Sequence, residues 1–86
     1  MKKIELTNNF YNKNLLRKVS LNITEIREVL GIGRDKTQII VKKIRNENKS
    51  YYNRKKEVYG TTSISPLHLM MYVVGWTREE FMNFIK

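Results

Sequence analysis

Cysteine is absent from this 86-residue sequence, and histidine and proline each occur once. The absence of cysteine excludes disulfides, thiolate metal sites and cysteine nucleophiles. A single histidine also removes most zinc sites and most acid–base catalytic schemes. We therefore predict that the protein is not an enzyme. We expect no catalytic residues, no metal, no other cofactor and no evident small-molecule ligand.

Long apolar runs are missing as well. No stretch approaches the roughly 20 apolar residues that span a membrane, and Met1-Lys2-Lys3 is followed by Ile4-Glu5-Leu6-Thr7 rather than by an apolar signal core. We expect a cytoplasmic protein with no membrane partner. The composition is 41% hydrophobic, which is enough for a folded core, and the length suits one domain over residues 1–86.

Acidic residues are few. There are 8 Asp and Glu against 17 Lys and Arg, so the formal net charge is +9. Nine of the cations but only two of the acidic residues lie in residues 34–56, which gives that segment a net charge of +7. A Lys-rich surface without a specific role is the alternative, but the neutral-to-acidic C-terminal third argues against it. One sign of charge gathered in one segment is typical of a surface that binds a polyanion.

Residues 22–48 are predicted to form two short helices. Asn22 suits the N-cap of the first helix, with Glu25 placed for a capping box, and Gly31 ends it. The second helix is expected to begin near Gly33 or Arg34 and to run to about Asn46. Because only a short turn separates the two helices, the segment is predicted to be a helix-turn-helix. The expected buried stripe of the second helix is Thr37, Ile40, Val41 and Ile44.

The opposite face of the second helix is polar and has cations on its flanks. Polar side chains in the middle of such a face can read base edges in a major groove, while flanking cations bind phosphates. For Ile39, on the same face, burial in the core is favoured over contact with a thymine methyl group. The residues expected to read bases are Asp35, Lys36, Gln38 and Lys42.

Residues 50–64 are predicted to form a β-hairpin. Aromatic and β-branched runs flank a basic stretch, which is expected to be the tip. The tyrosines of the hairpin are expected to cover the adjoining helix rather than to stack on bases. Phosphate contacts are expected from the cations that flank the second helix and from the one that follows it: Arg34, Lys43, Arg45 and Lys49.

Residues 65–86 are predicted to form two C-terminal helices. Ser65-Pro66 suits the start of the first, and Thr77 with Glu80 repeats the N-cap pairing at the second. Residues 1–19 are expected to be an arm or a short strand, with a helix from Thr7 to Lys18 as the alternative. The fold class is therefore mostly α with a small β-hairpin (α+β). The first C-terminal helix is expected to bury Leu67, Met70, Met71 and Val74, and His68 is expected to be a surface or packing residue.

The segment Ile23 to Val41, and especially Leu30-Gly31-Ile32-Gly33-Arg34-Asp35-Lys36-Thr37, resembles the first part of excisionase-type, MerR-like winged helix-turn-helix proteins of phages, plasmids and integrative elements. The resemblance covers roughly residues 22–64. In that family a hairpin wing follows the recognition helix, where residues 50–64 lie, so the resemblance implies that Arg54, Lys55 and Lys56 of the wing contact the DNA backbone or the minor groove. This chain departs from the pattern in its longer second helix and its added C-terminal helices. The resemblance implies sequence-preferring binding of double-stranded DNA by an architectural accessory factor. An integrase or recombinase, or further copies of the chain as a dimer or cooperative array, would be its protein partner.

Two other functions stay open. One is a dimeric transcriptional repressor that binds a palindromic operator. The other is a phage-type inhibitor of a host nucleic-acid enzyme, which would bind its target through Trp76, Phe81 and Phe84. RNA binding is less favoured because the basic helix suits the major groove of B-form DNA.

Overall fold

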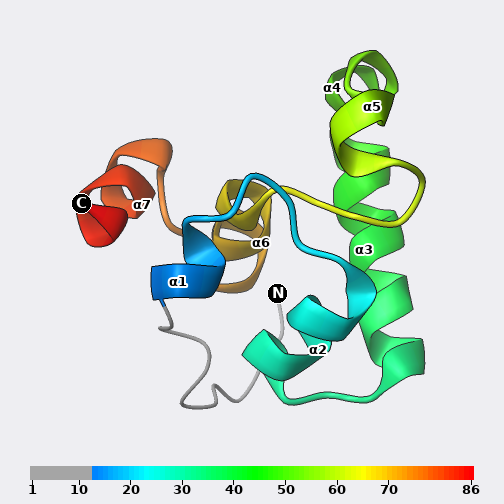
Figure 1. The fold of residues 1–86 in the computed structure, drawn as a ribbon, viewed down its shortest axis with the longest axis horizontal. Coiled ribbons are helices and arrows are strands. Elements are labelled where there is room, and N and C mark those ends of the chain that lie inside the picture. The colour runs from blue at the N-terminus through cyan, green and yellow to red at the C-terminus, as the bar shows by residue number, and fades with distance from the viewer. Residues whose placement is uncertain (1–12) are drawn as a thin grey trace.

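The computed structural model describes residues 13–86, and this part of the chain contains seven α-helices joined by short loops. The longest, α3, has α4 and α5 at its C-terminal end and α2 beside its N-terminal half (Figure 1). Helix α6 lies in the middle and contacts α1, α3 and α7. The bounds are α1 (Lys13–Leu16), α2 (Ile23–Leu30), α3 (Arg34–Glu47), α4 (Lys49–Arg54), α5 (Lys56–Tyr59), α6 (Pro66–Val73) and α7 (Arg78–Ile85).

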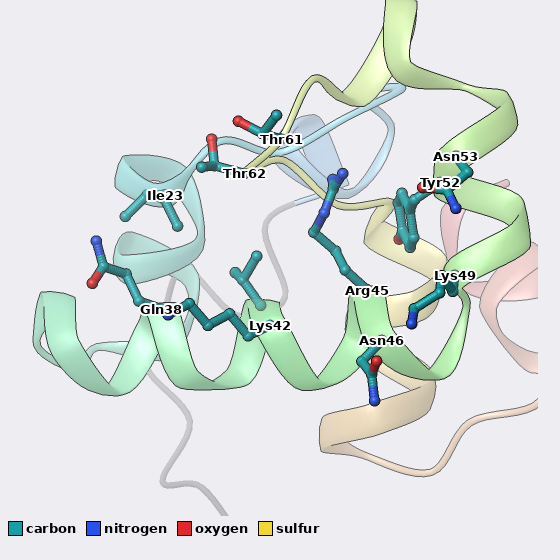
Figure 2. Close-up of a pocket in the computed structure, with 11 residues that line it drawn as sticks. Ile23, Gln38, Lys42, Arg45, Asn46, Lys49, Tyr52, Asn53, Thr61 and Thr62 are labelled. Atoms are coloured by element: carbon teal, nitrogen blue, oxygen red, sulfur yellow. The ribbon is translucent and has the colours of Figure 1, made fainter.

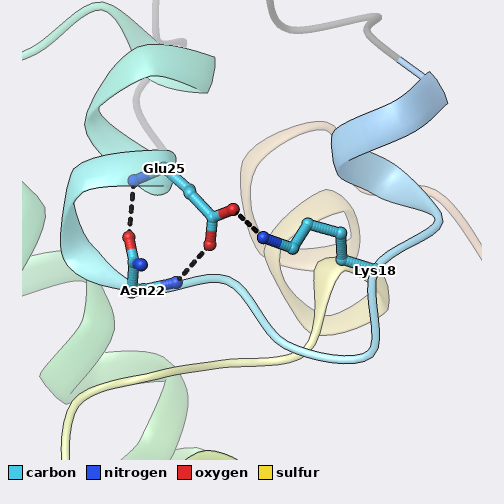
Figure 3. Close-up of polar contacts among 3 residues, drawn as sticks. All are labelled: Lys18, Asn22 and Glu25. Carbon is cyan, nitrogen blue, oxygen red and sulfur yellow. Dashed lines mark hydrogen bonds and ion pairs between the residues drawn. The ribbon is translucent and has the colours of Figure 1, made fainter.

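The predicted start and end of α2 are confirmed. The Asn22 side chain accepts a hydrogen bond from the Glu25 N–H at 2.8 Å, and the Glu25 carboxylate accepts one from the Asn22 N–H at 3.0 Å (Figure 3). Gly31 follows the helix with a φ of 66°, a left-handed conformation that glycine adopts without steric cost. These contacts are local, so they shape the turn between α2 and α3.

Glu25 also pairs with Lys18, from the segment that precedes α2 (Figure 3). Partial burial raises the pKa of the Glu25 carboxyl, but the hydrogen bonds from Lys18 and from the Asn22 N–H, together with the Lys18 charge, outweigh it and lower the pKa overall. The capping carboxylate is therefore kept ionised at the positive end of α2.

Helix α3 matches its prediction in extent and in orientation. Thr37, Val41 and Ile44 are buried, and Ile40 is partly buried. The hydroxyl of the buried Thr37 has a hydrogen-bond partner, because it donates to the Gly33 carbonyl at 2.8 Å. The stripe packs against α2 and α6 and leaves the other side of α3 in solvent.

The predicted wing is wrong. Residues 49–59 form α4 and α5, and residues 13–86 contain no β-strand or hairpin. The basic stretch Asn53–Glu57 lacks the glycine with positive φ that tight hairpin turns require, and its Arg, Lys and Glu residues favour helix. Tyr52 and Tyr59, aromatic residues of the runs from which strands were predicted, are buried in the core between helices.

The C-terminal helices begin at the predicted caps, but α6 buries a different face. The Ser65 hydroxyl accepts from the Leu67 N–H, and Thr77 and Glu80 form a second capping box. Met71 and Val74, expected in the core, are 43% and 37% exposed. Because α6 is surrounded by three helices, it buries a wider face, made of Leu67, Leu69, Met70 and Val73.

The N-terminal segment is helical where it is described. Residues 1–12 lie outside the described part, and with them the predicted strand at Ile4 and Leu6. Lys13–Leu16 form α1, so the arm or strand is wrong for these residues and the helical alternative fits them. Arg17 Nε donates to the Ile85 carbonyl at 2.7 Å and ties α1 to α7. Leu21 pairs with Ile64 in an isolated antiparallel bridge, which is the one β-type contact among the described residues.

Candidate nucleic-acid interface

The outward face of α3 presents the residues predicted to read bases. The side chains of Asp35, Lys36, Gln38 and Lys42 are all exposed. Ile39 is 54% exposed, so its predicted burial in the core is wrong. It points away from the stripe that contacts α2 and α6, and no other described element covers it. An apolar side chain thus stands among polar ones on an open helix face.

The cations of this region are not neutralised by neighbouring carboxylates. Arg34 and Lys43 are exposed on the flanks of α3. The ion pair found within residues 13–86 joins Lys18 to Glu25, outside the basic segment. Because the acidic residues within the segment, Asp35 and Glu47, pair with no described cation, ion pairs among the described residues do not offset the net charge of +7 over residues 34–56.

Arg45 differs from the other predicted phosphate ligands, because its guanidinium group is already occupied. Nη1 donates to the Ser63 carbonyl at 2.6 Å, and Nη2 donates to the Gly60 carbonyl at 2.8 Å. The group also lies 4.8 Å from the centroid of the Tyr52 ring, a cation–π contact. Arg45 therefore joins α3 to the loop before α6 instead of projecting into solvent.

The remaining predicted phosphate ligands lie on α4 and at its junction with α5. All are exposed, but they extend the basic surface beyond the C-terminal end of α3 instead of forming the tip of a wing (Figure 1). Arg54 Nε donates to the Ser50 carbonyl at 3.3 Å, and the Lys55 ammonium lies 5.6 Å from the Tyr51 ring centroid. This group is Lys49, Arg54, Lys55 and Lys56.

A groove of about 420 Å³ runs between α3 and the loop of residues 60–63 (Figure 2). We call it the α3–loop groove. Thr61 and Thr62 lie on the loop side, and no Asp or Glu contributes to its lining. Sequence reasoning missed these two threonines because they were assigned to a strand, and nothing local indicates that they face α3. The polar residues on the helical side are Gln38, Lys42, Arg45, Asn46, Lys49 and Asn53.

Beneath this groove the tyrosines form a packed cluster with His68. The Tyr52 hydroxyl accepts from the Ser65 N–H at 3.0 Å and lies 2.6 Å from His68 Nδ1. The Tyr52 hydroxyl and His68 Nδ1 share a hydrogen bond, and the tautomer of His68 decides which of the two atoms donates. The Tyr51 and Tyr59 hydroxyls lie 3.1 Å apart. The prediction that these tyrosines and His68 serve packing is confirmed.

Burial controls the titration of this cluster. It raises the pKa of Tyr52 to about 12 and, together with the hydrogen bond to Tyr51, that of Tyr59 to about 12. It lowers the pKa of His68, with a further contribution from the charge of Arg78. The tyrosines therefore stay protonated, and the histidine is kept neutral.

The aromatic residues of the C-terminal region hold α7 on the body of the protein. Phe81 is buried, and the Trp76 and Phe84 rings pack with their centroids 5.1 Å apart. These are the residues through which an inhibitor of a host enzyme would have bound its target. Phe81 is enclosed, whereas Trp76 and Phe84 stay partly exposed.

No protein-family model, curated protein or solved structure matches this chain. Within residues 13–86, no helix is long and apolar enough to cross a membrane, and no three acidic, histidine or cysteine side chains gather as metal ligands would. The function is therefore inferred from the side chains of this chain.

Proposed function

We propose that this protein binds double-stranded DNA and places α3 in the major groove. One observation carries the proposal: the outward face of α3 combines exposed hydrogen-bonding side chains with cations that have no carboxylate partner among the described residues. A helix of 14 residues is about 21 Å long, and the groove, about 12 Å wide, admits an α-helix. The helix is held from behind by α2 and α6, so its outward face is free to dock.

Each residue on this face suits a particular base edge. The Gln38 amide can both accept and donate, which matches adenine, and the exposed Ile39 side chain suits the methyl group of thymine. Lys36 can donate to guanine, and Asp35 can accept from the amino group of cytosine. A preference for sequence would therefore come from Asp35, Lys36, Gln38 and Ile39, while the flanking Arg34 and Lys43 would bind phosphates.

The proposal makes binding strongly dependent on salt. If about six phosphates are neutralised, the affinity falls roughly 10³-fold between 50 and 200 mM salt. The first experiment is a titration of a mixed-sequence duplex at low and moderate salt, followed by selection of preferred sites from a random pool. No binding at low salt would refute the proposal.

Two substitutions on α3 separate the two kinds of contact. Gln38→Ala should reduce discrimination between selected and random duplexes, because it removes a base contact. Lys43→Gln should weaken all duplexes alike and lower the salt slope by about one. Lys86→Gln, at the C-terminus, is the matched control for loss of one positive charge. If Gln38→Ala and Lys43→Gln behave identically, the orientation of α3 is wrong.

For the biological role, we propose an architectural accessory factor of a mobile element, acting beside an integrase or recombinase. The support is the resemblance at residues 30–37, which form the turn and the start of α3. This role predicts a monomer in solution and binding to direct repeats, whereas a repressor would be a dimer on a palindrome. Sedimentation of the free protein, with the arrangement of the selected sites, distinguishes them.

A further inference from the structure

The α3–loop groove is built before any ligand arrives, because Arg45 joins its two walls. From α3, its guanidinium donates to the Gly60 and Ser63 carbonyls on either side of Thr61 and Thr62. Figure 2 shows the side chain crossing from α3 toward the loop beside the Tyr52 ring. Gly60 has a φ of 56° and a ψ of −134°, a backbone conformation in which a residue with a side chain would be strained. The loop is thus held in place without belonging to a helix or strand.

The chemistry of the groove suits an anion with several oxygen atoms. Lys42 and Lys49 supply positive charge, and Thr61 and Thr62 are exposed hydroxyl groups on the other wall. The carboxamides of Asn46 and Asn53 add further donors. No carboxylate lines the groove to repel an anion. Ammonium, hydroxyl and amide groups are the usual ligands of nucleic-acid phosphates.

We propose that the α3–loop groove binds the phosphodiester backbone of one DNA strand, with Lys42, Lys49, Thr61 and Thr62 as contacts and Arg45 as a positioning residue. This rests on the proposed function of α3, since a helix in the major groove is flanked by a sugar-phosphate backbone. The groove lies directly alongside α3, where that backbone passes. Because the loop is already held, binding does not have to order it. Lys42 thereby becomes a phosphate contact rather than a base-reading residue.

Arginine at position 45 can be tested apart from its charge. Arg45→Lys keeps the net charge but removes the planar fork that reaches two carbonyls at once. We expect about tenfold weaker binding to a mixed-sequence duplex, since loss of one hydrogen bond to a charged group has roughly that effect. Discrimination between selected and random duplexes should be unchanged. If the affinity does not change, Arg45 acts only by charge or not at all, and its positioning role is wrong.

The threonines give a test that does not depend on Arg45. The double variant Thr61→Val, Thr62→Val keeps the side-chain shape and removes both hydroxyls, and we expect it also to weaken binding about tenfold. Thr24→Val, an exposed threonine on α2 outside the groove, is the matched control and should bind like the parent protein. This test remains available if Arg45→Lys fails to fold.

Combining the substitutions shows whether Arg45 acts through the loop. In the Thr61→Val, Thr62→Val background, Arg45→Lys should weaken binding further by less than about twofold, because the contacts that it positions are already gone. If the two effects multiply, Arg45 and the threonines act independently, and the positioning role is wrong.

The source of the phosphate is distinguished by NMR titration of the backbone amides of residues 60–62. A mixed-sequence duplex should shift them at the concentrations at which it binds, whereas inorganic phosphate should do so only at far higher concentration. Duplex binding that shifts α3 but not the loop, with the threonine variants unaffected, would refute the groove and leave α3 as the DNA-binding element. Absence of any duplex binding would refute both. Saturation by inorganic phosphate at low concentration without a response to duplex would show a small-anion site instead and refute the groove proposal.

Discussion

Among changes that remove a single side-chain oxygen, loss of the Tyr52 hydroxyl is the one that we expect to destabilise the protein most. It accepts from the Ser65 N–H at 3.0 Å and is hydrogen-bonded to His68 Nδ1 at 2.6 Å, so it joins α4 to the start of α6. The Tyr52 side chain is 1% exposed, and Ser65 is buried. Water cannot readily replace the hydroxyl at such a site.

The magnitude for Tyr52→Phe follows from these two bonds. An unsatisfied buried N–H at Ser65 costs about 1–3 kcal/mol, and the lost bond at the half-buried His68 adds about 1 kcal/mol. We therefore expect a loss of about 2–4 kcal/mol in the free energy of unfolding. For a domain of this size the Tm would fall by roughly 10–30 °C. The phenyl ring stays in place, so the contact with the Arg45 guanidinium remains and affinity for duplex DNA should be unchanged.

Urea denaturation followed by far-UV circular dichroism measures this effect. Tyr72→Phe is the matched control, because it removes a hydroxyl that is hydrogen-bonded to no described residue, and it should change stability by less than about 0.5 kcal/mol. A Tyr52→Phe protein as stable as the Tyr72→Phe protein would refute the assigned hydrogen bonds. A stable Tyr52→Phe protein that loses DNA affinity would instead assign the hydroxyl to the ligand.

Three further predictions concern pH, capping and the α3 surface. Burial, and to a smaller extent the charge of Arg78, hold the pKa of His68 below its usual 6.5, so the unfolded chain binds more protons than the folded one below that pH. The free energy of unfolding should therefore be at its full value above about pH 6.5 and fall as the pH drops. In urea titrations between pH 7 and 5, His68→Gln should make this dependence on pH less steep. An unchanged slope would contradict the neutral, buried histidine. Asn22→Ala should cost about 1 kcal/mol and lower the Tm, because it removes the cap of α2; an unchanged Tm would show that the Glu25 half of the capping box suffices. Ile39→Ser should leave the Tm within about 2 °C of the parent protein, since the side chain is exposed. Ile39→Ser should also reduce preference for thymine in the selected sites, and retained preference would remove Ile39 from the base-reading face.

The helix boundaries were predictable because their signals are local. Asn22 with Glu25, and Thr77 with Glu80, close their hydrogen bonds within three residues, so the backbone groups that need partners and the side chains that supply them can be recognised together. Gly31 likewise marks the end of α2 by its own conformational freedom. These signals act before any tertiary contact forms, and tertiary contacts do not override them here.

The hairpin was not predictable in the same way. The aromatic and β-branched preference for strands reflects packing on a half-buried surface more than a backbone preference, so it depends on what lies next to the segment. Here Tyr52 and Tyr59 find their partners in each other and in the His68 ring. Helices α4 and α5 bury these rings, so their burial does not require a hairpin. The role of Arg45 escaped prediction for a related reason, because its carbonyl partners lie 15 and 18 residues away.

Replacement of the hairpin by α4 and α5 changes how the basic segment would meet DNA in the proposed complex. A wing would have placed Arg54, Lys55 and Lys56 beside the recognition helix, on a separate part of the duplex. In the structure these cations lie where α4 ends and α5 begins, and both helices lie past the C-terminal end of α3 (Figure 1). The loop held by Arg45 then forms the second wall beside α3 that a wing would have supplied. In the proposed complex, the cations and this loop together favour contact with one major groove and the phosphates that border it, rather than simultaneous contact with two grooves of the duplex.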